Sequence, residues 1–397
     1  MAKYLDGNVS PGFVALYTGK TITMIAGGLL GLYLPIFLFN LFNGSLISVM
    51  LFFVASSLLY VATVAAGARF LNHFGFRRAL IASTFFGALF FIIFSFITKQ
   101  NALTLLFLAL FVLTIYRILY WVPYIVDFAK FTDRRNRGRE LSVLGITRDI
   151  LGIVVPVIAG YVLSRYDFTV LFAASIVLYL LSAIPYIVIP KTQEQYRWGY
   201  GETWRHFFDR SRRRTILAFV ADGAESLVAL EVWPIFIFLV LSGDYLKVGA
   251  ISTVIIGVTV LLQLTMGKYI DASDDHAERA LHVGSFFYSI GWILKMFVLN
   301  AYHIFVLGAY HSVVKIVMQI PFDALTFELA ADEGHYVDEF TVLHEMAVHI
   351  GKALMALLVI GVAWFLPIQW TFLLAAFSTV FLNVLQKHRP PLVRRPV

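Results

Sequence analysis

Long apolar stretches recur along almost the whole sequence and restrict what the chain can fold into. A bilayer core about 30 Å thick needs about 20 apolar residues per helix. Such lengths favour helices, because the strands of a membrane barrel have about ten residues of alternating polarity. The sequence therefore predicts an all-α polytopic membrane protein with twelve transmembrane helices. We place them at about 12–42, 46–70, 78–98, 102–128, 142–164, 168–190, 214–241, 246–267, 280–299, 302–327, 340–364 and 367–387.

The composition agrees with this class and excludes others. Of the 397 residues, 60% are hydrophobic and 14% are charged, against roughly 25% charged in an ordinary soluble domain. There is no cysteine, so disulfides and thiolate chemistry are excluded. The net charge of +7 collects in alternate loops, which indicates topology rather than nucleic-acid binding. The polar start and the long first apolar run predict no cleaved signal peptide.

Lysine and arginine in the loops predict the orientation. The loops after the second, fourth and sixth stretches are rich in arginine, and the odd-numbered loops have almost none. Because basic loops stay in the cytoplasm, we expect both termini there, in the plasma (inner) membrane of a prokaryote. Residues 191–213 interleave Trp and Phe with Arg. This segment is either an amphipathic helix on the anionic inner leaflet or a solvated linker.

The second half of the sequence repeats the first at a nearly constant offset. Pro35 recurs as Pro234 and Glu140 recurs as Glu339, each within a similar local sequence. One register held over several places indicates two copies of one unit. We predict six-helix bundles at 1–190 and 214–397, joined by a cytoplasmic linker at 191–213. Six helices per copy give both copies the same orientation, which makes a parallel repeat.

The loop between the second and third stretches carries a motif. Residues 68–78 resemble the pattern Gly-x-x-x-Asp-Arg-x-Gly-Arg-Arg, with Ala68 for its first Gly and Asn72 for its Asp. With the repeat and the topology, this motif makes the chain resemble the major facilitator superfamily of secondary transporters. The resemblance implies that helices 1, 4, 7 and 10 line a central cavity, 2, 5, 8 and 11 form the interface, and 3, 6, 9 and 12 face outward. It also implies a cytoplasmic gate of Asn72, Gly75, Arg77, Arg78, Asp271 and Arg279.

The fifth stretch carries a second, weaker resemblance. Gly152, Pro156 and Ala159-Gly160 are similar to the Gly-Pro-x-x-Gly-Gly element of drug and proton antiporters, with Val155 in place of the Gly before Pro. A Pro between small residues allows a bend and close helix packing, but both residues are common in membrane helices. The element tilts the interpretation toward export only slightly.

Three carboxylates distinguish the seventh stretch from its counterpart in the first half. An ionised side chain at mid-bilayer costs about 2.5–3.5 kcal/mol, so Asp222, Glu225 and Glu231 should face protein or water. Asp222 and Glu225 share one helix face, and Glu231 lies about half a turn round. We expect Glu225, helped by Asp222 and Glu231, to bind and release the coupling proton. The alternative is a neutral acid bonded to a neighbouring helix.

Polar residues at helical spacing mark the fourth and tenth stretches, which the resemblance places on the cavity wall. A basic cavity facing Glu225 would hold an anionic or zwitterionic substrate, or its cations would be counter-ions of Glu225. For the tyrosines, helix packing is the alternative. The expected substrate-cavity residues are Arg117, Tyr120, Tyr124, His311, Lys315, Gln319 and, from the first stretch, Lys20.

For the remaining charged residues within the predicted membrane stretches, we expect structural roles. On the interface helices we expect ion pairs between helices, with proton relay as the alternative, for Arg148, Asp149, Glu345, His349 and Lys352. Near the outer end of the ninth stretch, Lys295 is expected to extend its ammonium to the interface. Because His344 and His349 lack supporting ligands, we expect no metal and no cofactor.

Together these features predict a secondary active transporter that moves a small organic solute by alternating access. We expect coupling to protons, or to sodium, and export by antiport ahead of uptake by a symporter or facilitator. The expected partners are the solute, the ion and the bilayer, with no nucleic acid and a monomeric chain. No phosphate-binding loop occurs, so ATP-driven pumping would need a partner. The alternatives of another class are a lipid-handling membrane enzyme and a non-transporting sensor.

Overall fold

All regular elements are helices in the part of the chain that the structure, a computed structural model, describes: residues 10–131, 137–192, 195–270, 274–332 and 337–385. The first half contains α1 (Pro11–Gly31), α2 (Tyr33–Leu41), α3 (Leu46–Phe74), α4 (Phe76–Ser95), α5 (Ala102–Phe131), α6 (Arg137–Arg165), α7 (Phe168–Leu181) and α8 (Ala183–Ile187). The second half contains α9 (Tyr200–Phe207), α10 (Arg213–Leu227), α11 (Trp233–Val240), α12 (Tyr245–Ile270), α13 (Asp274–Lys295), α14 (Ala301–Asp332), α15 (Val337–Phe365) and α16 (Thr371–Phe381).

The apolar character of these helices makes the chain a polytopic membrane protein. Within the described ranges, nine helical stretches are long and apolar enough to cross a membrane. Two shorter apolar helices, Tyr245–Leu261 and Ile368–Val384, add to them. The all-α membrane class is therefore confirmed, and the count of twelve spans stays a prediction.

Four of the predicted helices are not continuous α-helices, and prolines explain three of the breaks. The helix predicted at 12–42 divides at Leu32 and the one at 168–190 divides at Ser182, while a π-helical turn, Val228–Val232, separates α10 from α11. A proline has no N–H for the carbonyl four residues before it. Four residues before Pro35 and Pro185 are the last residues of α1 and α7, and four before Pro234 is Leu230 in the π-helical turn. Short 3₁₀ turns flank α16, at Ile368–Trp370 and Leu382–Val384. The other helices differ from the predicted ranges only at their ends.

The chain forms two compact units that do not coincide with the two halves of the sequence. Unit 1 consists of Met1–Asn43, Ala66–Tyr196 and Asp244–Thr253. Unit 2 consists of Gly44–Ala65, Arg197–Gly243 and Val254–Val397. The first part of α3 therefore groups with unit 2, and the first part of α12 groups with unit 1.

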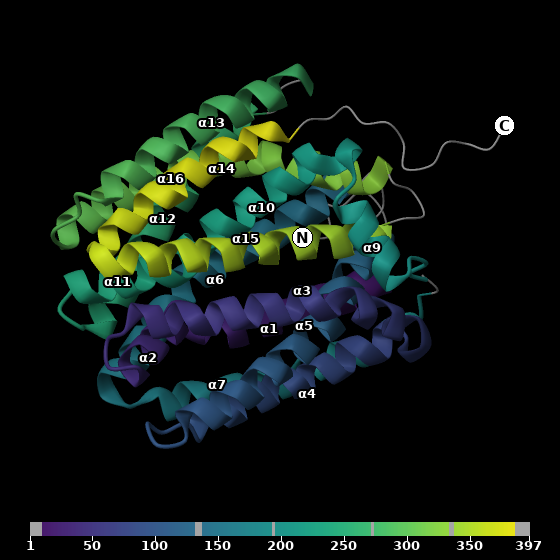
Figure 1. Cartoon of the computed structure of the whole chain (residues 1–397), viewed down its shortest axis with the longest axis horizontal. Helices are drawn as coiled ribbons and strands as arrows, with labels where there is room; N and C mark the ends of the chain where they lie inside the picture. Colours follow the sequence, from purple (N-terminus) through teal and green to yellow (C-terminus); the bar gives the residue numbers. More distant parts are fainter. Residues whose placement is uncertain (1–9, 132–136, 193–194, 271–273, 333–336, 386–397) are drawn as a thin grey trace. The chain divides into compact units, whose positions relative to one another are not determined.

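In unit 1, α1 packs against α5, α6 and α7, and α4 packs against α5 and α7 (Figure 1). The first turns of α12 belong here because glycines allow close contact with α6. The Tyr33 hydroxyl lies 2.9 Å from the Pro156 carbonyl oxygen and 3.2 Å from that of Tyr245. A Cβ at Gly160 or Gly249 would collide with this hydroxyl and with backbone carbonyls. The small residues around Pro156 therefore serve helix packing.

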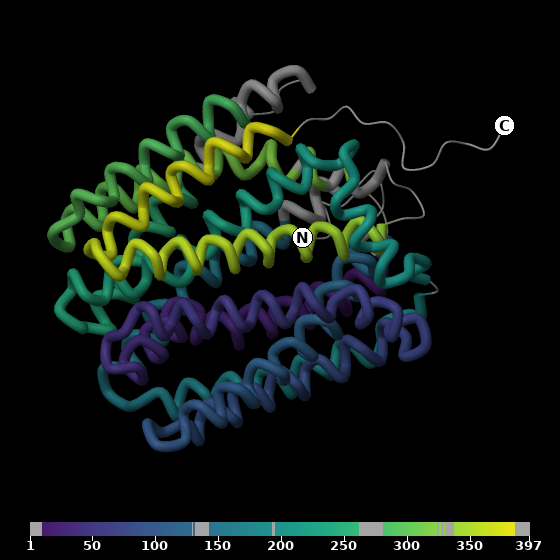
Figure 2. Tube along the Cα trace, viewed as in Figure 1, coloured from purple at the N-terminus to yellow at the C-terminus, as the bar shows by residue number. Residues whose placement is uncertain are grey.

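In unit 2, α10 packs against α15 and α16, and α13 packs against α14 and α16 (Figure 2). The contact between α10 and α15 brings backbone against backbone. A Cβ at Gly223 would lie 1.9 Å from the Val348 carbonyl oxygen, and one at Gly351 would lie 1.9 Å from that of Val220. Two glycines thus set how closely α10, the helix with the acids, approaches α15. The packing pairs correspond between the units, because α1 with α6 and α7 matches α10 with α15 and α16.

The segment between the halves folds as α9, which packs against α15. The apolar face of α9 buries Thr203 and Phe207, and its other face leaves Arg205 exposed. The Arg197 N–H donates to the Glu339 carboxylate at 2.8 Å. These contacts tie the segment that begins at Arg197 to α15, whose first turn carries Glu339.

Candidate functional site

Glu225 lies at the centre of a polar cluster inside unit 2. Its side chain is 2% exposed. The Tyr288 hydroxyl of α13 donates to one carboxylate oxygen at 2.5 Å, and the Lys315 ammonium of α14 lies 3.7 Å from the other. A buried carboxylate is stable only when it is paired and hydrogen-bonded. Helices α13 and α14 supply the hydrogen bond and the cation to an acid that α10 carries.

His311 borders this cluster, one turn before Lys315 on α14. Its ring centroid lies 4.3 Å from that of Tyr288 and 4.6 Å from that of Trp292. Gly291 makes room for it, because a Cβ there would lie 2.8 Å from His311 Nδ1. His311 is therefore held by ring contacts with α13, on the side of Tyr288 that faces Trp292.

Lys295 is buried on α13, so the prediction that it extends to the membrane interface was wrong. Its side chain is 3% exposed. Its ammonium lies 4.2 Å from the ring centroid of Trp233 and 4.1 Å from that of Trp292. Two indole faces replace water around the cation. The position of a lysine near a helix end could not reveal that aromatic rings from α11 and α13 converge on it.

Asp222 and Glu231, the other two acids of the segment that carries Glu225, lie in helical turns of different type. Asp222 is half-buried, one turn before Glu225 on α10. Glu231 lies within the π-helical turn, where each residue advances round the axis by less than in an α-helix. The prediction that it sits about half a turn round from Asp222 assumed a regular α-helix, which this π-helical turn interrupts. On α14, the Gln319 amide donates to Asp323 at 2.7 Å.

Unit 1 holds a lysine among aromatic rings. The Lys20 ammonium of α1 lies 4.5 Å from the ring centroid of Trp121, 4.6 Å from that of Tyr124 and 5.1 Å from that of Tyr120. Tyr116, Tyr120 and Tyr124 follow each other at the helical spacing of four and stack, with centroids 5.5 and 5.6 Å apart. Within the described ranges, no carboxylate pairs with Lys20. Arg117 is half-buried on the same helix, α5.

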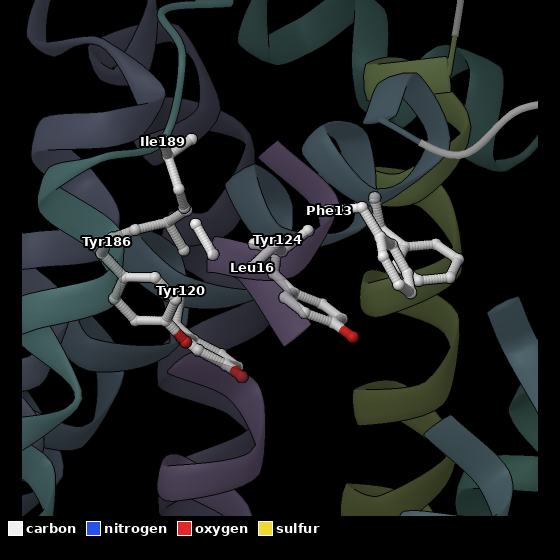
Figure 3. Close-up of a cluster of buried hydrophobic side chains, with 9 residues drawn as sticks. Phe13, Leu16, Tyr120, Tyr124, Tyr186 and Ile189 are labelled. Carbon is white, nitrogen blue, oxygen red and sulfur yellow. The ribbon is translucent and has the colours of Figure 1, made fainter. Parts of the chain in front are cut away.

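Tyr120 and Tyr124 also belong to a buried apolar cluster of unit 1, which fixes them in place. The cluster joins α1, α5 and the segment at α8 (Figure 3). Phe13 and Leu16 come from α1, and Tyr186 comes from α8. The tyrosines therefore serve both the packing and the lining of the Lys20 site.

Several of the residues assigned to inter-helix ion pairs have contacts in the described part of the chain, and their role in ion pairs between helices stays a prediction. Arg148 pairs with its neighbour Asp149 at 3.8 Å, within α6 rather than between helices. In unit 2, the Tyr60 hydroxyl of α3 donates to Glu345 of α15 at 3.2 Å, and its ring lies 4.6 Å from that of His349. Lys352 is half-buried, one turn beyond His349.

In the predicted gate, Asn72 binds the main chain of Tyr196 twice. Its amide donates to the Tyr196 carbonyl at 2.8 Å and accepts from the Tyr196 N–H at 2.9 Å. An ionised aspartate could only accept. This pair gives the physical reason for Asn72 where the family motif has Asp.

The other gate residues are partly described. Gly75 precedes α4 with φ +84°, which favours glycine. Arg77 is half-buried and Arg78 is exposed. Asp271 and the side chain of Arg279 lie outside the described residues.

Comparison with known proteins identifies the family. The model of the Major Facilitator Superfamily matches residues 16–330. The chain belongs to the Major Facilitator Superfamily. A curated relative, the uncharacterized protein YqgE of Bacillus subtilis (strain 168), is 20% identical over 242 residues, which are 59% of this chain and 55% of that protein. The match thus spans about half the length of that relative.

Solved structures show the fold over nearly the whole chain. A peptide transporter POT in complex with sulfate has a TM-score of 0.69 at 12% identity, over 94% of this chain and 93% of that one. A POT family transporter in complex with 5-aminolevulinic acid has a TM-score of 0.69 at 11% identity, over 94% and 95%. The family and the fold are those of a non-enzymatic transporter, which confirms the resemblance and excludes the enzyme alternative.

Sequence reasoning missed the residues of α13. The resemblance placed the ninth helix outward, and one face of α13 is indeed exposed at Val283 and Phe286. The opposite face turns Tyr288, Trp292 and Lys295 into unit 2. Their spacing of four and three is the helical stripe that could have revealed them.

Proposed function

We propose that this transporter carries a small organic solute with an anionic group and that a proton bound at Glu225 drives it. The observation that carries the proposal is the burial of Glu225 between the Tyr288 hydroxyl and the Lys315 ammonium. An intramembrane ionisable residue with a named partner is a functional candidate by default. A carboxylate with one hydrogen bond and one cation can change its charge without leaving its position.

Protonation of Glu225 would change what Lys315 can bind. With Glu225 ionised, the two charges neutralise each other. With Glu225 neutral, Lys315 keeps its charge and loses its partner, and its side chain is 37% exposed against 2% for Glu225. A carboxylate or phosphate of a solute then binds Lys315 most favourably. The proton and the anionic group would therefore bind together.

Joint binding supports movement of the proton and the solute in the same direction. The molecules bound in the two similar transporter structures, sulfate and 5-aminolevulinic acid, are anionic and zwitterionic. A cationic solute competing with the proton for Glu225 would instead meet the charge of Lys315 at 3.7 Å from that acid. The geometry thus favours symport over the export that the sequence led us to expect.

Export by proton exchange is the second candidate. The observation that favours it is the Pro156 element of α6, whose Gly160 packs against the Tyr245 carbonyl. For either direction we place the protein in the plasma membrane of a prokaryote, with both termini cytoplasmic, as the basic loops suggest.

The test uses purified protein in liposomes that contain a pH-sensitive dye. A library of small carboxylate, phosphate and zwitterionic solutes is added outside, and the internal pH is followed. We expect a solute that acidifies the interior for wild type and does so at least about tenfold more slowly for Glu225→Gln. The matched control is Asp127→Asn, which alters another buried carboxylate, held in unit 1 by a hydrogen bond from Thr192 at 2.7 Å.

Each outcome decides one part of the proposal. Alkalinisation of the interior would show exchange and support the second candidate. A response of Glu225→Gln equal to wild type would refute the role of Glu225. A solute flux that follows a sodium gradient at constant pH would refute the proton as the coupling ion.

A further inference from the structure

We propose that Tyr120, Trp121 and Tyr124 form a binding site for the ammonium group of the transported solute, and that the Lys20 ammonium holds this site until the solute displaces it. The inference rests on the proposed transport function and adds the chemical class of the solute. Its site lies entirely within unit 1. It therefore shares no residue with the acid cluster of unit 2.

The Lys20 ammonium shows that the site accepts a primary ammonium group. Three ring centroids lie 4.5–5.1 Å from its nitrogen, inside the distance of about 6 Å at which a cation is attracted to a ring face. Cages of aromatic rings are a recurrent means of binding ammonium ligands. A free alkylammonium of the same shape would find the same contacts.

The rings are held in place before any ligand arrives. The planes of Tyr116 and Tyr120 differ by 12°, and those of Tyr120 and Tyr124 by 8°. Tyr120 and Tyr124 are buried in the cluster with Phe128 and Tyr186 (Figure 3). Because the rings are already ordered, less conformational entropy is lost when a ligand binds, and the binding free energy is more favourable.

Lys20 itself is held loosely enough to be displaced. Over the described ranges it has no carboxylate partner, and each cation–ring contact is worth only about 0.5–2 kcal/mol. Arg148 of α6 repels it, and Asp149 pairs with Arg148 at 3.8 Å. A solute ammonium replaces the charge of Lys20 with an equal one, so the repulsion from Arg148 does not favour either occupant. Lys20 is half-buried, on a flexible four-carbon stem.

The chemical consequence is a solute that carries an ammonium group. The aromatic site of unit 1 binds a primary or substituted ammonium. Solutes with only an anionic group would leave the Lys20 site unused.

The chain offers a matched control in Lys295. This lysine also lies between aromatic rings, Trp233 and Trp292, at 4.1–4.2 Å. It is 3% exposed, however, and it shares unit 2 with Glu225. The proposal assigns the placeholder role to Lys20 and not to Lys295.

The test removes the lysine side chain and restores its ammonium as a free molecule. Purified Lys20→Ala is titrated with butylammonium, and isothermal titration calorimetry gives the dissociation constant without relying on Trp121 as a reporter. We expect Lys20→Ala to bind butylammonium at least about tenfold more tightly than wild type, in which Lys20 competes. Lys295→Ala should show no such gain, and Trp121→Leu added to Lys20→Ala should abolish the binding.

Two further measurements keep the result interpretable. Neutral 1-butanol separates the cation from its apolar chain, and the proposal is refuted if it binds Lys20→Ala as well as butylammonium does. Thermal unfolding shows whether Lys20→Ala is folded; if it is not, Lys20→Met replaces it with tetramethylammonium as the probe. A folded variant without tighter binding refutes the proposal. Adding Glu225→Gln to Lys20→Ala should leave the binding unchanged, so a failure of proton coupling is recognised separately.

Discussion

Both units place a lysine beside aromatic rings, and among the described residues only the lysine of unit 2 has a carboxylate partner. In unit 1, Lys20 faces Tyr120, Trp121 and Tyr124. In unit 2, Lys315 faces Tyr288 and pairs with Glu225. The charge of a lysine among rings is constant, whereas that of a lysine paired with a carboxylate depends on the protonation of its partner. Under the proposed function, this difference would confine proton coupling to unit 2, because a buried acid lies beside the lysine there.

The two units also differ in how they hold the helix that bears these residues. A Cβ at Gly19 of α1 would collide with the ring of Tyr186, a side chain, while one at Gly223 of α10 would collide with the main chain of α15. Side chains can adjust more readily than backbone. The acid-bearing helix is thus the more tightly constrained of the two.

The largest effect should come from breaking that constraint. In Gly223→Ala, the new Cβ would lie 1.9 Å from the Val348 carbonyl oxygen, so α10 and α15 must separate. Overpacking of this kind costs about 3 kcal/mol or more, and we expect a clear fall of the unfolding temperature in detergent. Gly257→Ala, where nothing lies within 4 Å, is the control. Equal unfolding temperatures for the two variants would contradict the backbone contact.

Removing each lysine tests the difference between the two sites. Lys315→Gln takes away the cation that pairs with Glu225 and that we assign to the anionic group of the solute. Hydrogen bonds to charged groups contribute about 1.5–3 kcal/mol, so the apparent affinity for the solute should fall at least about tenfold. In Lys20→Gln the affinity should stay the same or rise, because a competitor is gone. The measurement is the solute concentration for half-maximal transport, and equal losses in both variants would erase the proposed distinction.

A smaller effect is expected for the hydroxyl that binds the acid. Tyr288→Phe removes the hydrogen bond to Glu225 and leaves a buried carboxylate with one partner fewer, at a cost of about 1–3 kcal/mol. The proton-driven transport rate should fall about tenfold. The control is Tyr310→Phe, because the Tyr310 hydroxyl donates to a main-chain carbonyl, that of Phe287, at 3.2 Å. If Tyr310→Phe is impaired as strongly, the Tyr288 bond has no special role.

The smallest effect concerns the anchors of the segment between the halves. In unit 1 it is held at Tyr196 by the neutral amide of Asn72. In unit 2, the ring of His206 stacks on Trp198 at 4.0 Å, and burial and the charge of Arg212 lower the pKa of His206. Because the unfolded state then binds a proton more readily, acidification below the ordinary histidine pKa of about 6.5 should weaken this anchor.

The measurement is the part of the tryptophan fluorescence that Trp198→Phe removes, followed between pH 7.5 and pH 5. We expect this part to change for wild type and to change less for His206→Gln. Asn72→Ala should loosen the segment equally at all pH values, because no titrating group is involved. A pH response that survives in His206→Gln would contradict the assignment.

Much of the fold could be predicted from the sequence because each span is a local pattern. The length of the apolar runs gave the membrane class, and the prolines that explain the breaks in the helices at 12–42, 168–190 and 214–241 were visible in the sequence. The breaks themselves were missed, because apolar periodicity does not report a change in helix type. Only the missing N–H of Pro35, Pro185 or Pro234 signals it.

The charged residues of the site could be predicted from the sequence, but the residues that contact them could not. A buried acid has to be paired, which pointed to Glu225 and to basic residues on the tenth stretch. Which residues meet it depends on contacts between segments far apart in the sequence. Tyr288 and Trp292 look like ordinary aromatic residues of an apolar helix until α13 is seen to pack against α14. For the same reason Lys295 was expected at the membrane surface.

The central claim is that Glu225 carries the coupling proton. The most direct measurement is the current that solute addition evokes from purified protein on a solid-supported membrane, for wild type, Glu225→Gln and Asp127→Asn. We predict a transient proton current for wild type and Asp127→Asn and none for Glu225→Gln. An equal current from Glu225→Gln would contradict the claim and would direct the search for the coupling group to Asp222, Glu231 or Asp149.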